Sequence, residues 1–265
     1  MSLIDAILLG ILQGATEFLP VSSSGHLVLA QHLLADFQQP GVLFDVLLHV
    51  GTMVAVVIYF RRDLAGLILS LWQSGPKADQ QRRLLGLLVA GSIPTAAIGL
   101  TFKDFFEKIF DRPDLVCLML LVTGCLLWLA QQLRGSKSPR QQLNLLDALV
   151  VGTAQGAAII PGISRSGATI ATLLLRGIDG ETAARFSFLL ALPAVSGAAL
   201  LSLRDAGGIP QESGLAYLAG ALAAMVTGLV CIHLLLAVVR KQRLHWFALY
   251  CWGVGLTGGL LFVSQ

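Results

Sequence analysis

Two short stretches, FLPVSSSGH at residues 18–26 and IIPGISRSGAT at residues 159–169, decide how this chain folds. Each places Pro, Gly and Ser in the middle of an apolar segment, the first at about 2–35 and the second at about 143–176. Each segment is too long for one helix, and each flank of its break is too short to cross a hydrocarbon layer about 30 Å thick. We therefore predict two re-entrant helical hairpins, because broken backbone is tolerated at membrane depth only where protein buries it or where it lines a wet cavity.

The rest of the chain has the composition of an integral membrane protein. Its 265 residues are 55% hydrophobic and 12% charged, with a mean hydropathy of +0.78, whereas soluble domains are about one quarter charged. Lipid must therefore be its solvent. The net charge of +3 does not indicate binding to nucleic acid, because the basic residues lie in a few loops between apolar runs. Six apolar runs are long enough to span a bilayer: they lie near residues 41–60, 84–102, 115–133, 185–203, 215–237 and 246–264.

Charged residues between these runs indicate the orientation. Three loops are rich in Lys and Arg and are therefore predicted to be cytoplasmic: 61–83, 134–142 and 238–245. The loops 103–114 and 204–213 have mixed or acidic charge and are expected on the outer face, together with both termini. Six transmembrane helices plus two re-entrant hairpins satisfy this alternation. We predict an all-α polytopic protein that forms a single integral membrane domain over residues 1–265.

The two broken segments also resemble each other. A shift of 142 residues places Gln13-Gly14-Ala15 on Gln155-Gly156-Ala157 and Ser22 on Ser164. Each half, about 1–135 and 143–265, is then a hairpin followed by three spans. Because three is odd, the halves must be inverted relative to each other, as in many transporters whose discontinuous helices meet near the bilayer midplane.

The first break holds residues that are expected to perform chemistry. Ionisable residues at membrane depth are costly, so Glu17 and His26 are functional candidates by default. Between them the serines 22–24 lead into Gly25, and a serine run before a helix caps it and leaves backbone N–H groups for an anion. Simple capping of a broken helix is the alternative interpretation; it explains the serines but neither Glu17 nor His26.

The second break supplies a cation. Arg165 lies between Ser164 and Ser166, and its planar guanidinium matches the oxygens of a phosphate group. Under the repeat, Arg165 corresponds to Ser23, so the two halves differ at the positions that carry reactive side chains. We expect the first half to carry the nucleophile and the proton transfer, and the second half to clamp phosphate.

A mechanism follows from these residue types. Ser23 is the expected nucleophile and His26 its base, while Glu17 orients the imidazole or holds a divalent cation. Direct attack by water, with Ser23 donating only a hydrogen bond, is the alternative. Asp45 and His49 lie one helical turn apart near the outer end of the run 41–60 and are candidates for the mouth of the site.

The motifs resemble those of a known family. The stretch from Gln13 to Glu17, followed by PVSSSGH at 20–26 and PGISRSGAT at 161–169, is similar to the (E/Q)xxxE and PGxSRSxxT motifs of undecaprenyl-diphosphate phosphatases of the bacitracin-resistance type. The resemblance covers nearly the whole chain, including RFSFLLALP at 185–193. It implies hydrolysis of undecaprenyl diphosphate to the monophosphate on the periplasmic side of a bacterial inner membrane. Such a reaction recycles the lipid carrier for peptidoglycan synthesis and counters bacitracin.

The resemblance also implies roles for particular residues. Four positions are expected to be catalytic: Glu17, Ser23, His26 and Arg165. Six more are expected to assist in binding phosphate: Ser22, Ser24, Gly25, Ser164, Ser166 and Thr169. A divalent cation, Mg²⁺ or Ca²⁺, is expected from the family, with Glu17 and Gln13 as candidate ligands; Gln13 stands where a glutamate is also allowed, which argues against a site with two carboxylates. The expected partners are a polyprenyl diphosphate and membrane lipid, not nucleic acid, and the oligomeric state is left open.

Two other functions fit part of the pattern. SSSGH resembles the PSGH element of acid-phosphatase-like lipid phosphatases, but their SRxxxxxH element requires a histidine where this chain has Ala171, and no KxxxxxxRP is present. A transporter or flippase of the polyprenyl phosphate carrier fits the inverted repeat. Moving a lipid headgroup requires a clamp but no nucleophile and no acid–base pair, so the sequence favours hydrolysis.

Overall fold

The computed structural model describes residues 2–33, 42–110, 112–133, 139–205 and 214–263. Within these ranges the regular secondary structure is helical, apart from one isolated bridge between Arg140 and Ile178. The helices are α1 (Leu3–Phe18), α2 (Ser23–Leu33), α3 (Val42–Tyr59), α4 (Arg61–Leu69), α5 (Pro76–Thr101), α6 (Lys103–Phe110), α7 (Pro113–Gln132), α8 (Leu145–Ala157), α9 (Arg165–Leu175), α10 (Gly180–Asp205), α11 (Gly214–Arg240) and α12 (His245–Val263).

The long helices make this a multi-pass membrane protein. Among the described residues, α5, α7, α10 and α11 are long and apolar enough to cross a membrane, and α3 with α4 makes a fifth candidate if this pair, bent by 73°, is one span. As far as the structure describes them, the six apolar runs predicted from the sequence each correspond to a helix, and the two remaining apolar segments contain the helix pairs α1–α2 and α8–α9. The all-α prediction is confirmed, whereas the full arrangement of six spans with two re-entrant hairpins stays a prediction.

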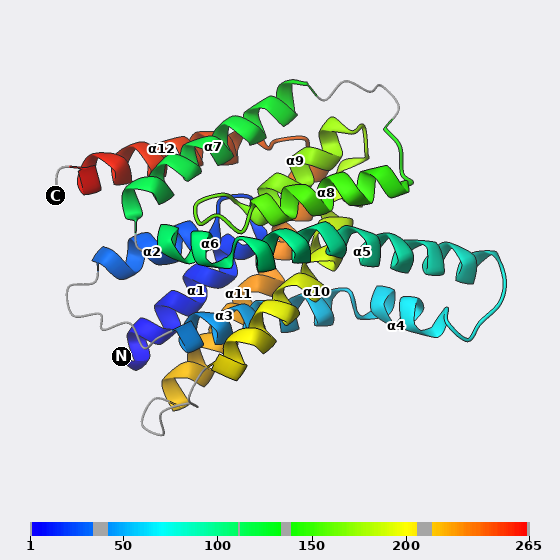
Figure 1. The fold of residues 1–265 in the computed structure, drawn as a ribbon, viewed down its shortest axis with the longest axis horizontal. Coiled ribbons are helices and arrows are strands. Elements are labelled where there is room, and N and C mark those ends of the chain that lie inside the picture. Colours follow the sequence, from blue (N-terminus) through cyan, green and yellow to red (C-terminus); the bar gives the residue numbers. More distant parts are fainter. Residues whose placement is uncertain (1, 34–41, 111, 134–138, 206–213, 264–265) are drawn as a thin grey trace.

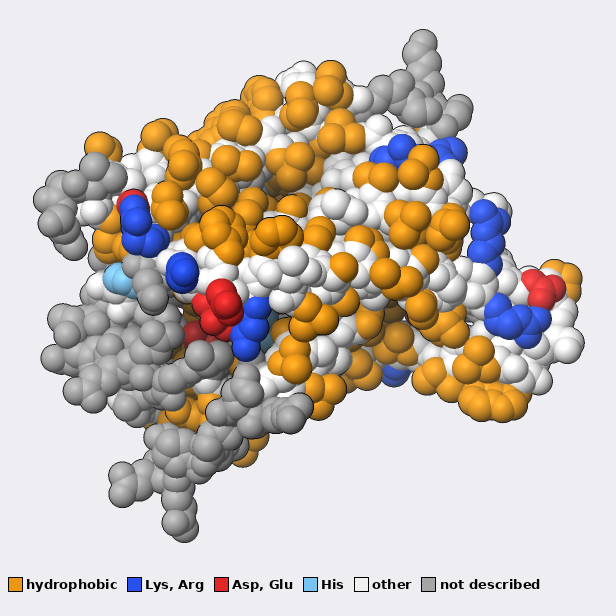
Figure 2. Space-filling model, viewed as in Figure 1, with side chains coloured by type: hydrophobic (Ala, Val, Ile, Leu, Met, Phe, Trp, Pro, Cys, Tyr) orange, Lys and Arg blue, Asp and Glu red, His pale blue; other side chains and the backbone are white. Residues whose placement is uncertain are grey.

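The two ends of the molecule differ in what they carry. Figure 1 shows the start of α1 and the end of α12 toward the left of the view, on the same side as α6, while α4 lies at the right. Hydrophobic side chains cover the broad middle of the face in Figure 2, and charged side chains gather mostly toward its two ends. This distribution fits a slab of lipid around the middle of the molecule. The predicted orientation depends in part on the loops 134–142 and 204–213, and these lie partly outside the described residues.

Both helix pairs are interrupted where the sequence predicts. The helix α1 ends because Leu19 precedes Pro20, and a residue before proline is held in the extended region; Leu19 has φ −65° and ψ 142°. In the second pair the chain turns at Pro161-Gly162, where Gly162 has a φ of 92° that favours glycine. In Figure 1 the two breaks lie in the interior of the bundle, between the pair α1–α2 and the pair α8–α9.

Positions 142 residues apart cap the two hairpins in the same way. The hydroxyl of Ser2 accepts a hydrogen bond from the backbone N–H of Asp5 at 3.1 Å, and the side chain of Asn144 accepts one from the N–H of Asp147 at 2.9 Å. In both cases the aspartate reaches back to the N–H of the capping residue, which completes a capping box. The two helices thus begin with equivalent contacts.

Equivalent glycines allow close helix packing. A Cβ atom on Gly10 of α1 would lie 2.2 Å from the carbonyl oxygen of Gly220 in α11, and one on Gly152 of α8 would lie 1.9 Å from that of Gly91 in α5. Both contacts therefore require glycine. Each hairpin packs its first helix against a long helix of the other half of the chain, as two interlocked repeats would. The halves 1–135 and 143–265 stay a prediction that these paired contacts support.

The base of the second hairpin, where α8 begins and α9 ends, is fixed by a buried carboxylate. Asp147 is fully buried and receives the Nε–H of Arg176 at 2.6 Å. Arg140 donates to both of its oxygens, at 3.1 and 3.2 Å. These two arginines tie the segment before α8 to the end of α9, so the hairpin is closed at its base.

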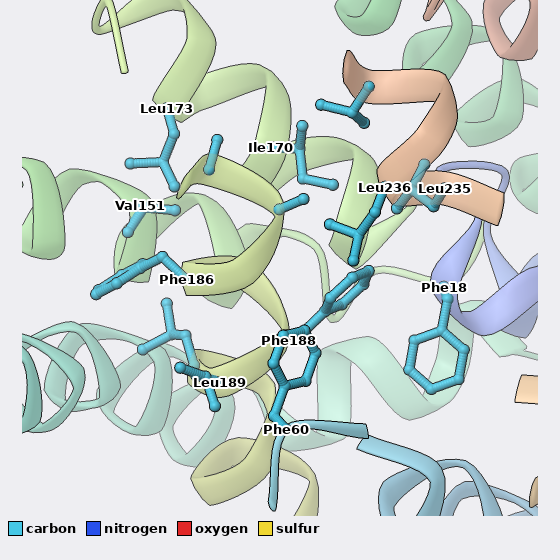
Figure 3. Close-up of a cluster of buried hydrophobic side chains, with 14 of the residues drawn as sticks. Phe18, Phe60, Val151, Ile170, Leu173, Phe186, Phe188, Leu189, Leu235 and Leu236 are labelled. Atoms are coloured by element: carbon cyan, nitrogen blue, oxygen red, sulfur yellow. The ribbon is translucent and has the colours of Figure 1, made fainter. Parts of the chain in front are cut away.

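A buried hydrophobic cluster holds the first break in place. Phe18 packs edge-on against Phe188 of α10, with ring centroids 5.5 Å apart, and Phe188 also contacts Phe60 at 6.0 Å. Figure 3 shows these rings together with side chains from α8, α9, α10 and α11. Since Phe18 is the residue after Glu17, this cluster fixes the position of the carboxylate in the interior.

Candidate active site

The two breaks lie against each other and bring an anion to a cation. The Nη2 atom of Arg165, at the start of α9, donates to Oε1 of Glu17, near the end of α1, at 2.6 Å. One residue further along α9, the hydroxyl of Ser166 donates to the carbonyl oxygen of Leu19 at 3.2 Å. Residues about 148 positions apart in sequence are thus neighbours, as the predicted meeting of the two breaks requires.

Glu17 is the centre of this cluster. Its side chain is 7% exposed, and the Oε2 atom accepts hydrogen bonds from Ser23 at 2.5 Å and from the amide of Gln13 at 3.0 Å. The Nε2 atom of His49, on α3, lies 3.7 Å from the same oxygen. Gln13 is one helical turn before Glu17, so α1 itself sets their contact. His49, which the sequence suggested for the mouth of the site, thus lies beside the carboxylate of Glu17 itself.

The predicted contact between Ser23 and His26 is not formed. The hydroxyl of Ser23 donates to Glu17, while the Nδ1–H of His26 donates to the carbonyl oxygen of Ser22 at 2.8 Å. The other ring nitrogen, Nε2, lies 2.8 Å from the hydroxyl of Tyr250 on α12. Both nitrogens of His26 are therefore occupied, and the group placed to take the proton of Ser23 is the carboxylate. The contact with Ser23 is absent because α2 turns the imidazole back onto its own first turn, and the role of His26 as a base stays a prediction.

The serines of both breaks cap the helices that follow. In the first break, the hydroxyl of Ser22 accepts from the N–H of Gly25 at 3.2 Å and lies 3.4 Å from that of Ser24. Ser164 makes the same two contacts in the second break, with the N–H of Gly167 at 3.0 Å and with the hydroxyl of Ser166 at 3.2 Å. These are the contacts that the capping interpretation predicts. They also leave α2 and α9 beginning at the cluster around Glu17, with their positive dipole ends toward it.

Thr169 is turned into the bundle. Its hydroxyl donates to the carbonyl oxygen of Arg165 at 2.8 Å and lies 2.5 Å from the hydroxyl of Ser187 on α10. It therefore supports the first turn of α9 from behind. The structure does not bring its side chain to the carboxylate of Glu17.

The comparison with known proteins agrees with the motifs. The family model described as bacitracin resistance protein BacA matches residues 6–257. This chain belongs to the BacA family. The resemblance noted from the sequence is confirmed.

Named relatives of this BacA family member are similar over nearly their full length. A protein named undecaprenyl-diphosphatase from Syntrophotalea carbinolica is 56% identical over 263 residues, which cover 99% of this chain and 98% of the relative. Proteins of the same name from Carboxydothermus hydrogenoformans and Methanobrevibacter smithii are 42% and 40% identical, covering 97% of this chain and 96% of each relative.

Two residues that support the breaks of this BacA family member were not anticipated from its sequence. The hydroxyl of Thr123, on α7, donates to the carbonyl oxygen of Gly162 at 2.9 Å and accepts from the N–H of Ser164 at 3.0 Å. Tyr250, on α12, contacts His26 as described above. A lone threonine or tyrosine in an apolar run carries no local signal, because only the folded bundle places it beside a break.

Two buried polar atoms beside the carboxylate have no hydrogen-bond partner within the described part of the chain: Nη1 of Arg165 and Oε1 of Gln13. An orphan donor and an orphan acceptor at one site suit a ligand that has an anionic group and an oxygen-bound cation or water. No group of three His, Cys, Asp or Glu side chains suitable for a metal ion occurs among the described residues. Mg²⁺ needs no such group, since it is often held by one or two carboxylates together with substrate phosphates. The oxygens of Glu17 and Gln13 fit that manner of binding.

Proposed function

We propose that this protein hydrolyses undecaprenyl diphosphate to undecaprenyl phosphate and phosphate. One observation carries the proposal: a hydroxyl, a carboxylate and a guanidinium meet at one buried point, with Ser23 at 2.5 Å and Arg165 at 2.6 Å from Glu17. Relatives of 40 to 56% identity that match nearly the whole chain are named undecaprenyl-diphosphatase. Transport of the lipid alone gives no reason for a serine hydrogen-bonded to a buried carboxylate.

The geometry suggests the order of events. Arg165 offers its free Nη1–H to an oxygen of the terminal phosphate, while Nη2 stays on Glu17. The oxygen of Ser23 then attacks the terminal phosphorus and its proton passes to Oε2 of Glu17. The bond from this phosphorus to the bridging oxygen breaks, and undecaprenyl phosphate leaves with the electron pair. Water next attacks the phosphoserine, so that phosphate is released and Ser23 regains a proton.

Arg165 and the helix ends contribute charge stabilisation throughout. Phosphoryl transfer depends mainly on positioning and on electrostatic stabilisation of the transferred group. A bound Mg²⁺ or Ca²⁺ would add positive charge against the phosphates, and Glu17 and Gln13 would hold it. Direct attack by water, with Glu17 as its base, is the mechanism that competes with a phosphoserine.

The isoprenoid chain requires an apolar exit from this polar point. A small cavity reaches Glu17 and Arg165, and its other walls come mainly from α3 and α10: Thr52, Met53, Val56, Ala191, Leu192 and Val195. We propose that the first isoprene units lie between these two helices, so that the lipid enters from the bilayer. The site is proposed to open to the periplasm of a bacterial inner membrane, where the reaction would return the carrier to peptidoglycan synthesis and confer bacitracin resistance.

Phosphate release by the purified protein tests the proposal. In detergent, the wild-type protein is expected to release one phosphate from farnesyl diphosphate and from longer prenyl diphosphates, and the assay is run with and without a chelator. Loss of activity on chelation and its return with Mg²⁺ or Ca²⁺ would support the cation. Folded protein that binds a prenyl diphosphate without releasing phosphate would refute hydrolysis and favour a transporter.

A further inference from the structure

Tyr250 reaches the first break from a distant part of the chain. It is 47% exposed, on α12, whereas His26 is 8% exposed and lies in α2. The Tyr250 hydroxyl is 2.8 Å from Nε2 of His26, and the two rings are nearly parallel at 7°, with centroids 5.5 Å apart. The two residues are 224 positions apart in the sequence, so no local sequence pattern predicts their contact.

The contacts of His26 decide which ring nitrogen carries hydrogen. Nδ1 lies 2.8 Å from the carbonyl oxygen of Ser22, and a carbonyl oxygen only accepts, so Nδ1 must be the protonated nitrogen. In the neutral ring, Nε2 then has the lone pair and accepts from the hydroxyl of Tyr250. The second bond of an imidazole commonly fixes its tautomer and orientation in this way.

Ser22 is the residue that this arrangement constrains. Its φ of 71° lies in the left-handed region that residues with a side chain rarely occupy, so the surroundings must hold it there. The carbonyl oxygen of Ser22 accepts from both the backbone N–H of His26, at 3.2 Å, and the ring Nδ1–H, at 2.8 Å. Ser23 follows directly and begins α2. The conformation at Ser22 therefore sets the direction in which the Ser23 hydroxyl leaves the backbone.

We infer that Tyr250 is a positioning residue for the proposed reaction. Its hydroxyl donates to Nε2 and fixes the orientation of the His26 ring, His26 holds Ser22 in its left-handed conformation, and Ser22 directs the Ser23 hydroxyl at Glu17. This inference rests on the proposed function for its effect on rate, but the chain of contacts stands apart from it.

The second break is supported in a comparable manner. Thr123 of α7 donates to the carbonyl oxygen of Gly162 and accepts from the N–H of Ser164, and α7 packs directly on α12. Next to Tyr250, the thiol of Cys251 lies 3.8 Å from the carbonyl oxygen of Pro20. Adjacent helices thus each supply polar contacts to the backbone or the histidine of one break. Thr123 and Cys251 contact backbone atoms of the breaks, whereas Tyr250 contacts an ionisable side chain, that of His26.

Tyr250→Phe is the decisive variant, because it removes the hydroxyl and keeps the ring. The matched control is Tyr59→Phe, which removes a hydroxyl placed 3.4 Å from Nδ1 of His233, another tyrosine–histidine pair. With farnesyl diphosphate, Tyr250→Phe is expected to lower kcat about 10-fold or more, by analogy with the loss of the hydrogen-bond partner of a metal-ligating histidine, and to leave KM within about twofold. Tyr59→Phe is expected to match the wild type in both.

The second readout needs no activity. In protein labelled with ¹⁵N at histidine, the His26 resonances, assigned by their loss in His26→Gln, are expected to show the Nδ1–H form in the wild type and in Tyr59→Phe. Tyr250→Phe is expected to shift the Nε2 resonance, because the lone pair of Nε2 loses its hydroxyl donor. Unchanged His26 resonances, or a kcat equal to that of Tyr59→Phe, would overturn the inference. If even the wild type releases no phosphate, the proposed function fails, and the resonances alone decide whether Tyr250 holds His26.

Discussion

Glu17→Gln separates the role of the carboxylate as a base from its role in binding. Glutamine keeps the size of the side chain but loses its charge and one of its two acceptor oxygens. In the structure those oxygens accept from Arg165 at 2.6 Å and from Ser23 at 2.5 Å and Gln13 at 3.0 Å. The variant therefore loses the carboxylate that is hydrogen-bonded to Ser23, and it leaves a guanidinium that is only 16% exposed without its counter-charge.

The expected magnitude follows from these contacts. Loss of a positioned general base lowers rates about 10² to 10⁴-fold, which corresponds to about 2.7–5.5 kcal/mol in the activation barrier. The affinity for the diphosphate is expected to stay the same or to increase. Removal of the negative charge frees Arg165 for the phosphates and ends the repulsion between them and the carboxylate of Glu17. We therefore expect kcat to fall at least about 10²-fold while the Kd for farnesyl diphosphate stays the same or decreases.

The assay combines phosphate release with direct measurement of binding on the same purified samples. Glu107→Gln is the matched control, since Glu107 lies 3.7 Å from Lys103 on the exposed helix α6. A kcat of Glu17→Gln within tenfold of the wild type would refute the assignment of Glu17 as base. Weakened binding that excess Mg²⁺ restores would instead make Glu17 chiefly a cation ligand.

Four further outcomes are expected. Ser23→Ala should retain less than about one tenth of the wild-type kcat with diphosphate binding intact, and greater turnover would indicate direct attack by water. Arg165→Lys should lose about 10²-fold in kcat because the charge stays but the two-pronged geometry does not, and near-normal phosphate release would show that charge suffices. Asp147→Asn should lower the thermal unfolding midpoint in detergent, with a loss of about 2 kcal/mol, because a buried carboxylate bonded to two arginines is removed; an unchanged midpoint would contradict that role. In intact cells, an impermeant thiol reagent should label Asp104→Cys and spare Lys241→Cys, and the reverse pattern would invert the proposed orientation.

The helical segments were largely predictable because lipid imposes a simple rule on length and composition. Pro20 and Pro161-Gly162 interrupt apolar segments, and each interruption is a break between two helices in the structure. Bilayer thickness predicts that such short flanks pair as hairpins. The number of spans is harder to derive, since α3 bends by 73° into α4 and length alone does not say whether such a pair crosses once.

The members of the site were easier to predict than their contacts. Glu17, Ser23 and Arg165 stand out because charge and hydroxyl groups are rare in apolar breaks, and the structure brings these three together. The partner of Ser23 was missed because spacing in sequence places His26 only three residues away, whereas the start of α2 directs its ring to Ser22 and Tyr250. Contacts of that kind depend on side-chain direction and on a helix more than 200 residues away, which no local pattern encodes.

The departure from symmetry at one pair of positions explains how two similar hairpins can make one asymmetric site. Ser23 and Arg165 are equivalent under the 142-residue shift, and both bond to the same carboxylate, Ser23 through Oε2 and Arg165 through Oε1. Two arginines there would crowd like charges around one acceptor, and two serines would leave the phosphates without a clamp. In the proposed reaction the hydroxyl and the guanidinium have separate roles, because Oε2 takes the proton of Ser23 while Oε1 holds Arg165 in place. Glu17 has no counterpart in the second hairpin, where the shift reaches Ile159, and a single carboxylate between the two breaks is sufficient for this division.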